Sequence, residues 1–295
     1  MRTGLIYAVI AYTIWGLLPL YWKWFDEMPA SEILSHRIVW SFVFVAGIIV
    51  FKKRWNELKQ TITARATVLP LIYSSLLITA NWLIFIWAVN NERAVETSIG
   101  YYLTPLINVV LAIIFLREKP VGGQWIAILL AGTAVLLIAF DYGSFPWISV
   151  SLALSFGLYG LAKKKLKIDA AIGLVTETMI VLPLAIIYWS YLGMSNLDTA
   201  WSLPLSSLLL LLLSGVMTAT PLLLFAKAVR KLPLSMIGFV QYIGPTLTLL
   251  LSVFVFKETI SPVMYISLIL IWTALVVYAI SSIRIAKAQR LAEAS

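Results

Sequence analysis

The sequence contains no cysteine and one histidine, His36. A chain without cysteine forms neither a disulfide nor a thiolate metal site. One histidine leaves no room for a multi-histidine metal site. We therefore expect no metal, no cofactor and no metal-dependent catalytic residues.

Charge is also scarce. Only 12% of the 295 residues are charged and 61% are hydrophobic, whereas a soluble domain keeps about a quarter of its residues charged. The charges gather in short clusters between long apolar runs, a pattern that predicts a polytopic α-helical membrane protein. The net charge of +9 does not indicate a nucleic-acid partner, because the basic residues lie in the connections between the runs.

The apolar runs are long enough to span a hydrocarbon core of about 30 Å. The first run lacks a small-x-small cleavage site and ends in aromatic residues, so we interpret it as a retained span and not as a signal peptide. The connections are too short to hold a soluble domain. The predicted spans are 4–22, 32–51, 68–89, 97–116, 122–140, 146–164, 170–192, 204–226, 233–256 and 262–283.

The distribution of lysine and arginine predicts the orientation. If the N-terminus is cytoplasmic, most of these residues fall on the inside, including the cluster Lys163, Lys164, Lys165 and Lys167. The outside connections hold Lys23, Arg93 and Lys257. We therefore expect both termini in the cytoplasm.

A long stretch, residues 98–118, recurs at residues 238–258, and the two copies align Tyr102 with Tyr242, Pro105 with Pro245, and Glu118 with Glu258. A repeat longer than one helix indicates a chain built twice, here as residues 1–142 and 143–295. Five spans in each half make the second half enter the membrane from the opposite side. Inverted repeats are typical of secondary transporters, whose substrate site lies near the midplane. The alternative is a duplication that merely enlarged the bundle.

The sequence thus predicts an all-α integral membrane protein with ten transmembrane helices, arranged as two inverted five-helix repeats around a central cavity. Ionisable residues inside such spans are functional candidates. Arg37 lies roughly 8 Å inside the outer end of the second span, and Glu177 about 10 Å inside the cytoplasmic end of the seventh. His36 precedes Arg37.

Arg37 and Glu177 occupy equivalent places in the two halves if the offset is 140 residues. Trp15 matches Tyr159 better at an offset of 144, which leaves the register of these spans open by about a turn. The two charges can form an ion pair that a substrate or a proton opens, or a purely structural pair. In a third interpretation, Arg37 reaches outward to the membrane surface.

Polar and aromatic residues near these charges complete a candidate substrate site. We expect His36 and Arg37 to face an anionic group, and Glu177 to face a cationic group or a coupling proton. Aromatic residues at span ends, such as Trp22 and Trp189, are interpreted as an interfacial belt. The candidate site comprises Trp15, His36, Arg37, Trp40, Asn81, Trp82, Tyr101, Tyr102, Glu177, Gln241 and Tyr242.

Several segments of the chain resemble the RarD proteins, which are EamA-type members of the drug/metabolite transporter superfamily. The segments are Trp15-Gly16, SEILSHRIVWS at 31–41, NWLIFIWAVNN at 81–91, Glu177-Thr178-Met179 and QYIGPT at 241–246. The resemblance implies a ten-helix bacterial inner-membrane fold and transport of small metabolites or drug-like compounds, often outward. It also implies a site in a central cavity.

The sequence therefore favours a multi-pass secondary transporter that works by alternating access. Its expected partners are a small amphipathic substrate, the lipid bilayer and, as a coupling ion, protons. One alternative is a non-transporting membrane sensor or scaffold, although the chain offers no soluble output domain. A less favoured alternative is an integral-membrane enzyme, for which Glu177 with His36 is the candidate dyad.

Overall fold

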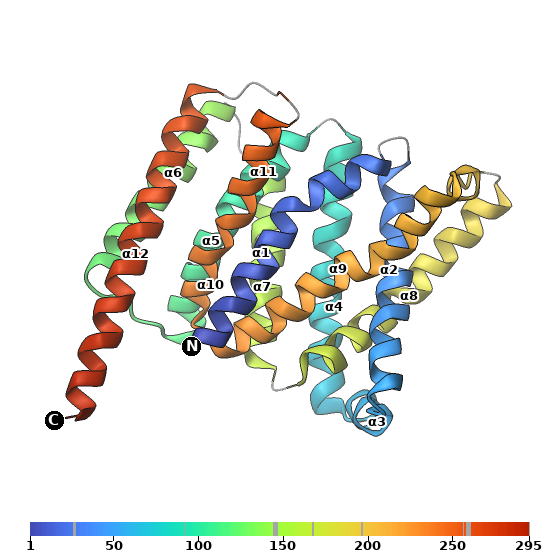
Figure 1. Cartoon of the computed structure of the whole chain (residues 1–295), viewed down its shortest axis with the longest axis horizontal. Helices are drawn as coiled ribbons and strands as arrows, with labels where there is room; N and C mark the ends of the chain where they lie inside the picture. The colour runs from blue at the N-terminus through green and yellow to red at the C-terminus, as the bar shows by residue number, and fades with distance from the viewer. Residues whose placement is uncertain are drawn as a thin grey trace.

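The described elements of the chain are helices (Figure 1). The computed structural model describes residues 1–25, 28–91, 93–143, 147–166, 168–195, 197–255, 257 and 261–294. The elements are α1 (Arg2–Trp22), η1 (Lys23–Phe25), α2 (Ala30–Phe51), α3 (Trp55–Thr63), α4 (Arg65–Asn90), α5 (Ala94–Leu116), α6 (Gly123–Tyr142), α7 (Trp147–Lys165), α8 (Ala170–Met194), η2 (Ala200–Ser202), α9 (Leu205–Lys231), α10 (Leu234–Gln241), α11 (Ile243–Phe254) and α12 (Pro262–Ala294).

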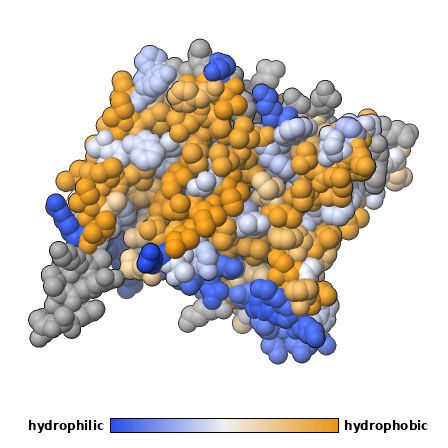
Figure 2. Space-filling view, viewed as in Figure 1, coloured by the Kyte–Doolittle hydropathy of each residue, from blue (hydrophilic) through white to orange (hydrophobic). Residues whose placement is uncertain are grey.

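Nine helical segments within the described ranges are long and apolar enough to cross a membrane. Large apolar side chains cover their outer faces; Leu129 and Ile269, for example, are 68% and 67% exposed. Figure 2 shows an apolar band across the middle of the molecule and the largest hydrophilic patch over α3. Such a surface is solvated by lipid chains, so the prediction of a multi-pass helical membrane protein is confirmed.

The predicted spans coincide with these nine segments, except for span 146–164. That span forms α7, which is less apolar because its last turn holds Lys163, Lys164 and Lys165. The predicted span 233–256 is not one helix but two, α10 and α11. Pro245 has no N–H to donate to the carbonyl of Gln241, the residue at which α10 ends. Pro105, its counterpart in the first half, lies inside an unbroken α5.

Three pairs of helices begin at positions separated by the repeat offset. The starts are 30 and 170 for α2 and α8, 65 and 205 for α4 and α9, and 94 and 234 for α5 and α10. Arg37 and Glu177 therefore sit at equivalent depths in α2 and α8, which favours the 140-residue register at this pair. Glu258, the expected partner of Glu118 in the repeat, lies outside the described residues.

The helices pack so that those of one half contact those of the other. The pair α6 and α12 forms one edge of the bundle and the pair α2 and α8 forms the other (Figure 1). Between them, α5 packs on α7 and α10, α1 packs on α9 and α11, and α4 packs on α7. Both chain ends and α3 lie on one side of the bundle, here called the α3 side (Figure 1).

Close helix crossings depend on glycine. A Cβ at Gly215 of α9 would lie 2.2 Å from the backbone carbonyl of Trp40 in α2. At this crossing Ser41 donates a 3.3 Å hydrogen bond to the carbonyl oxygen of Gly215. A Cβ at Gly238 of α10 would lie 2.6 Å from the carbonyl oxygen of Pro105. Small residues at these points let the backbones of the two halves touch, as is usual between membrane helices.

Replacing Gly215 by alanine is expected to destabilise the bundle, because the added methyl group forces α2 and α9 apart. Overpacking of this kind costs about 1–3 kcal/mol. The measurement is the thermal unfolding midpoint in detergent. Gly47→Ala is the matched control, since a Cβ there meets nothing within 4 Å. Equal midpoints for the two variants would contradict the assigned crossing.

Candidate functional site

The Glu177 carboxylate lies deep in the bundle, between α8, α7 and α4. Its side chain is 2% exposed, and its Oε1 accepts from Lys163 Nζ at 2.6 Å. Ser74 of α4 also donates to Oε1, and the Tyr159 hydroxyl donates to Oε2 at 3.4 Å. Because each carboxylate oxygen has a donor, the desolvation cost of this buried charge is offset.

This arrangement corrects two sequence-based expectations. Lys163 was grouped with the basic residues of a connection, but it belongs to the last turn of α7, and its side chain is only 6% exposed and faces Glu177. Glu177 was expected to pair with Arg37, and its partner is Lys163. The reason is that Tyr159 and Lys163, four residues apart, share the face of α7 that packs against Glu177.

Arg37 points from α2 into the space between α1, α4 and α9. Its Nε donates to Thr218 Oγ1 at 3.1 Å. Its guanidinium carbon lies 4.8 Å from the ring centre of Trp22 and 5.7 Å from that of Trp82. Tyr101, which is 47% exposed, lies near enough to interact with its charge. The expected proximity of Arg37, Trp82 and Tyr101 is therefore found, whereas Trp22 is not simply part of an interfacial belt.

His36 lies on another face of α2, against α8. Trp40 Nε1 donates to His36 Nδ1 at 3.3 Å, and the Trp189 ring lies 4.6 Å from the imidazole. Trp189 also donates to Ser35 Oγ at 2.7 Å, so it too is more than a belt residue. One turn earlier, Glu32 accepts from the backbone of η2. His36 thus joins α2 to α8 and does not form a dyad with Glu177.

Aromatic rings fill the middle of the bundle. Trp15 of α1 lies 5.8 Å from Phe225 of α9 and 5.9 Å from Phe156 of α7. Phe225 stacks on Tyr159 at 6.1 Å, and Tyr12 lies 5.3 Å from Trp15. We call these five residues the aromatic column. It reaches the Glu177 network through the Tyr159 hydroxyl, and it occupies the region where an open central cavity was expected.

The remaining predicted polar residues connect helices around this column. Gln241 Oε1 accepts from Asn108 Nδ2 at 2.8 Å and from the Tyr12 hydroxyl at 3.3 Å. Asn81 donates to the carbonyl of Leu152 at 2.9 Å and to Ser155 at 3.0 Å, both in α7.

Two predicted tyrosines lie apart from the column. Tyr102 and Tyr242 are buried near the α5–α10 crossing, where the Tyr102 hydroxyl donates to the carbonyl of Pro245 at 3.4 Å. They share an apolar cluster with Phe239. They do not reach the Arg37 region.

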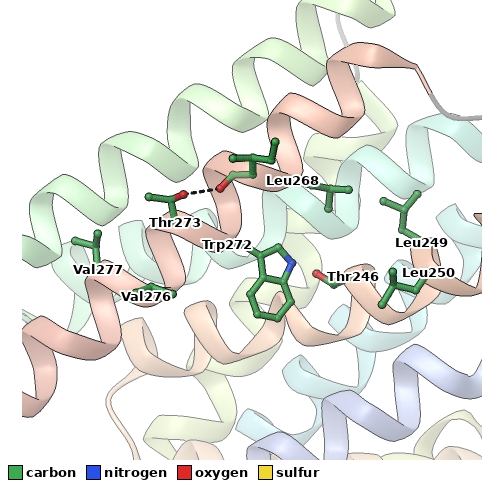
Figure 3. A pocket seen from close by; sticks show the side chains of 9 residues that line it. Thr246, Leu249, Leu250, Leu268, Trp272, Thr273, Val276 and Val277 are labelled. Carbon is green, nitrogen blue, oxygen red and sulfur yellow. Dashed lines mark hydrogen bonds between the residues drawn. The ribbon is translucent and has the colours of Figure 1, made fainter.

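Hollows occur at the lipid-facing surface and in the interior of the described part of the chain. A groove of about 560 Å³ lies between α11 and α12 and is open to the outside of the bundle (Figure 3). Its lining includes Leu250 and Trp272, which are 46% and 47% exposed, so it faces the lipid. A second hollow of about 10 Å³ lies beside Lys163, Asp169 and Arg230. It is about the size of one water molecule.

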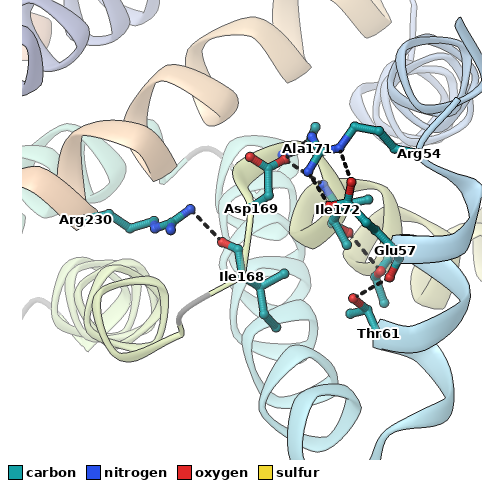
Figure 4. A network of polar contacts seen from close by, with 9 residues as sticks. Arg54, Glu57, Thr61, Ile168, Asp169, Ala171, Ile172 and Arg230 are labelled. Atoms are coloured by element: carbon teal, nitrogen blue, oxygen red, sulfur yellow. Dashed lines mark hydrogen bonds and ion pairs between the residues drawn. The ribbon is translucent and has the colours of Figure 1, made fainter. Parts of the chain in front are cut away.

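A network of polar contacts lies on the α3 side of the bundle (Figure 4). Two of its residues, Asp169 and Arg230, also line the small hollow. Arg54 bridges Glu57 at 2.7 Å and Asp169 at 2.8 Å. Asp169 caps α8 by accepting from the backbone N–H of Ala171 at 3.0 Å. Partial burial opposes ionisation of Asp169, but the hydrogen bonds from Arg54 and from the helix outweigh it and lower the pKa of this carboxyl below its usual 3.8.

The structure thus adds residues that sequence reasoning did not select, namely Lys163, Tyr159, Ser74, Trp22, Thr218, Tyr12 and Asn108. The i, i+4 spacing of Tyr159 and Lys163 was a usable signal. Ser74 and Thr218 gave no such signal in the sequence, because their importance depends on which helix faces them.

These features, a multi-pass bundle with buried charges between its helices, define an integral membrane protein, and comparison with known proteins shows its family. Residues 2–140 and, separately, residues 146–280 match the model of the EamA-like transporter family. The chain belongs to this family.

Within the family, the chain has RarD proteins among its relatives, which confirms the resemblance. It is 42% identical to Protein RarD of Escherichia coli over 96% of this chain and 95% of that protein. It is 41% identical to an uncharacterized transporter, YojE, of Bacillus subtilis over 98% of this chain and 97% of that protein. We conclude that it is a multi-pass inner-membrane protein of a transporter family.

A solved structure described only as a crystal structure of a protein has the same fold. The TM-score is 0.72 at 13% sequence identity, and the match covers 95% of this chain and 98% of the other. At this identity the similarity supports the fold alone.

Removing either partner of the Lys163–Glu177 pair is expected to destabilise the protein by about 3–5 kcal/mol, because the other charge is left buried and unpaired. The double variant Lys163→Met with Glu177→Leu should recover most of this loss. Thermal unfolding of the four proteins in detergent forms a double-mutant cycle. Additive losses in the double variant would contradict the assigned pairing.

The lowered pKa of Asp169 predicts a pH-dependent stability. Its contribution is present above the usual carboxyl pKa of 3.8 and is lost as the pH falls through the lower folded-state value. Asp169→Asn keeps the helix cap but removes the charge. Wild type should therefore unfold at a higher temperature than this variant at pH 7, and the difference should shrink below about pH 4. A difference that stays constant with pH would refute the role of this charge.

Proposed function

We propose that this protein is a secondary transporter that works by alternating access, built from two inverted five-helix repeats. The proposed repeats are residues 1–142 and 143–295. In this proposal α7 is a span, and α10 with α11 forms another, which makes ten in all. The nineteen residues of α7 extend about 28 Å, close to the thickness of a hydrocarbon core.

One observation carries the proposal: the helix contacts keep their pattern when the halves are exchanged. The exchange replaces α1 by α7, α2 by α8, α4 by α9, α5 by α10 and α11, and α6 by α12. Under this exchange, the contact between α5 and α7 corresponds to the contact between α11 and α1. The contact between α1 and α9 corresponds in the same way to the contact between α7 and α4. The exchange leaves three contacts unchanged, because each joins a helix to its own counterpart: α2–α8, α5–α10 and α6–α12. Such a pattern supports a two-fold relation between the halves.

An odd number of spans per half gives the repeats opposite orientations, which is the architecture that alternating access uses. The aromatic column lies at the contact of the two halves and would have to separate for a substrate to pass. The open central cavity therefore belongs to another state of the cycle. The family membership of the chain and the transporter names of its relatives support the same function.

The proposed orientation places both termini and α3 in the cytoplasm. Arg54 and Asp169 lie on that side, as do the basic residues Lys52, Lys53, Lys59 and Arg65 around α3. The excess of lysine and arginine supports this orientation. The proposed direction is outward, as the resemblance to RarD proteins implies.

The proposed cargo is a small amphipathic metabolite or drug-like compound. The proposed site keeps the residues selected from the sequence and adds those that contact them: Trp15, His36, Arg37, Trp40, Asn81, Trp82, Tyr101, Tyr102, Gln241 and Tyr242, with Trp22 and Thr218. Glu177 is proposed as the coupling group, because it is buried and forms an ion pair with Lys163, which lines a hollow of water size.

A sensor or an enzyme is the less favoured function. An enzyme would need Glu177 to act with His36, but Glu177 forms its ion pair with Lys163, whereas His36 contacts the Trp189 ring and accepts from Trp40. No separate observation favours a sensor, so transport remains the proposal.

The proposed function is tested by comparing metabolites in cells that overproduce the wild type or the Arg37→Ala, Glu177→Ala double variant. A transporter should shift the distribution of at least one compound between cells and medium, and the double variant should not. Membrane levels of both proteins serve as the control. If no compound differs between wild type and double variant, transport is wrong.

Coupling is tested separately with protein in proteoliposomes and the compound so identified. Glu177→Gln is expected to abolish accumulation driven by a pH gradient but to leave exchange of cargo across the membrane. The amide retains the shape and a hydrogen-bond acceptor but cannot release a proton. If gradient-driven accumulation persists in this variant, Glu177 is not the coupling group.

A further inference from the structure

The charges buried in the bundle differ in how they are compensated. Glu177 is paired with Lys163, Glu96 with Arg93 at 2.6 Å, and Glu32 accepts hydrogen bonds from the backbone of η2. Arg37 has no ion pair within the described ranges of the chain. A guanidinium inside a membrane span without a counter-charge is costly. Its position therefore requires another explanation.

The contacts of Arg37 leave one part of the guanidinium free. Nε is used by Thr218, and the rings of Trp22 and Trp82 lie against the guanidinium carbon. For the two terminal nitrogens, no acceptor occurs among the side chains and carbonyls that the structure describes. These nitrogens present parallel N–H groups in one plane, the geometry that binds the two oxygens of a carboxylate.

The surroundings of this free edge suit a ligand with an apolar body. Tyr21 and Tyr101 lie near the Arg37 charge, in addition to the two tryptophans. Arg37 is only partly buried, and Tyr101 is 47% exposed, so the region reaches the surface of the molecule. Aromatic walls around a cation provide apolar surface for the rest of the ligand.

We propose that Arg37 binds the carboxylate of an amphipathic monoanion, whose apolar body lies against Trp22, Trp82 and Tyr101. This inference rests on the proposed function and specifies its cargo. One cation with no neighbouring acid selects a single negative charge. In the other half, Glu177 is already neutralised by Lys163, so that position offers no equivalent site.

The structural alternative is that Arg37 serves only to tie α2 to α9 through Thr218. The two roles differ in their dependence on the ligand's charge. A tie between helices would affect stability and would not discriminate between ligands. A carboxylate site would discriminate between an acid and its neutral amide of the same shape.

The test uses 3-phenylpropionate and the neutral 3-phenylpropionamide as probes with the full-length protein in detergent. Binding is followed by quenching of tryptophan fluorescence and by the shift of the unfolding midpoint. The wild type is expected to bind the acid at least about tenfold more tightly than the amide, since a charge-assisted pair to a partly buried cation is lost with the amide. Arg37→Gln should abolish this preference.

Two further variants keep the test decisive. Arg37→Lys retains the charge without the two-pronged geometry, so it should keep the preference for the acid but bind it more weakly. It also replaces Arg37→Gln if that variant does not fold. Lys52→Gln removes a positive charge far from the site and should bind as the wild type does.

Equal binding of acid and amide by the wild type, binding of neither probe, or a preference that survives Arg37→Gln would overturn the inference. The outcome is distinguishable from failure of the proposed function. If the wild type shifts a neutral or cationic metabolite in cells, transport stands and the anion site is wrong. If the acid binds through Arg37 but no compound is moved in cells, the anion site stands and transport is wrong.

Discussion

The pair of Lys163 with Glu177 is the interaction on which the interior of this bundle depends. A lone carboxylate among apolar helices is costly, and the cost falls only when donors surround it. Here the donors come from α7 and α4, so α8 is bound to two helices at a single point. The Tyr159 hydroxyl extends this network to the aromatic column, where α1, α7 and α9 meet. Rearrangement of the helices therefore changes the surroundings of Glu177.

The two halves use equivalent positions in different ways. Arg37 and Glu177 sit at the same place in α2 and α8, since these helices begin 140 residues apart at 30 and 170. Glu177 is neutralised within its own half by Lys163. Arg37 is surrounded by aromatic rings and a threonine hydroxyl. In the proposed transporter this divergence assigns separate tasks, coupling to one half and cargo binding to the other.

The close approach of the helices sets limits on how they move. Gly215 and Gly238 allow backbone contacts between α9 and α2 and between α10 and α5. The groove between α11 and α12 lies toward the edge formed by α6 and α12, and the break before Pro245 lies between that edge and the α2–α8 pair (Figure 1). Contacts at glycine are tight and tolerate little sliding, whereas a helix interrupted at proline can bend. The proposed motion is therefore expected to use α11 more than α2 or α10.

Apolar length and the repeat determined which segments of this chain become helices and which residues occupy equivalent positions in the two halves. That information is local, because a span needs about twenty apolar residues wherever it packs. The sequence also singled out Arg37, Trp82 and Tyr101, which the fold brings together. Only the tertiary structure decided that Lys163, and not Arg37, is the partner of Glu177, and that Trp22 covers Arg37. The partner of a buried charge depends on which faces of two helices meet. A shift of one turn at a helix crossing changes the neighbouring side chain, although it leaves the helical preference of each segment unchanged.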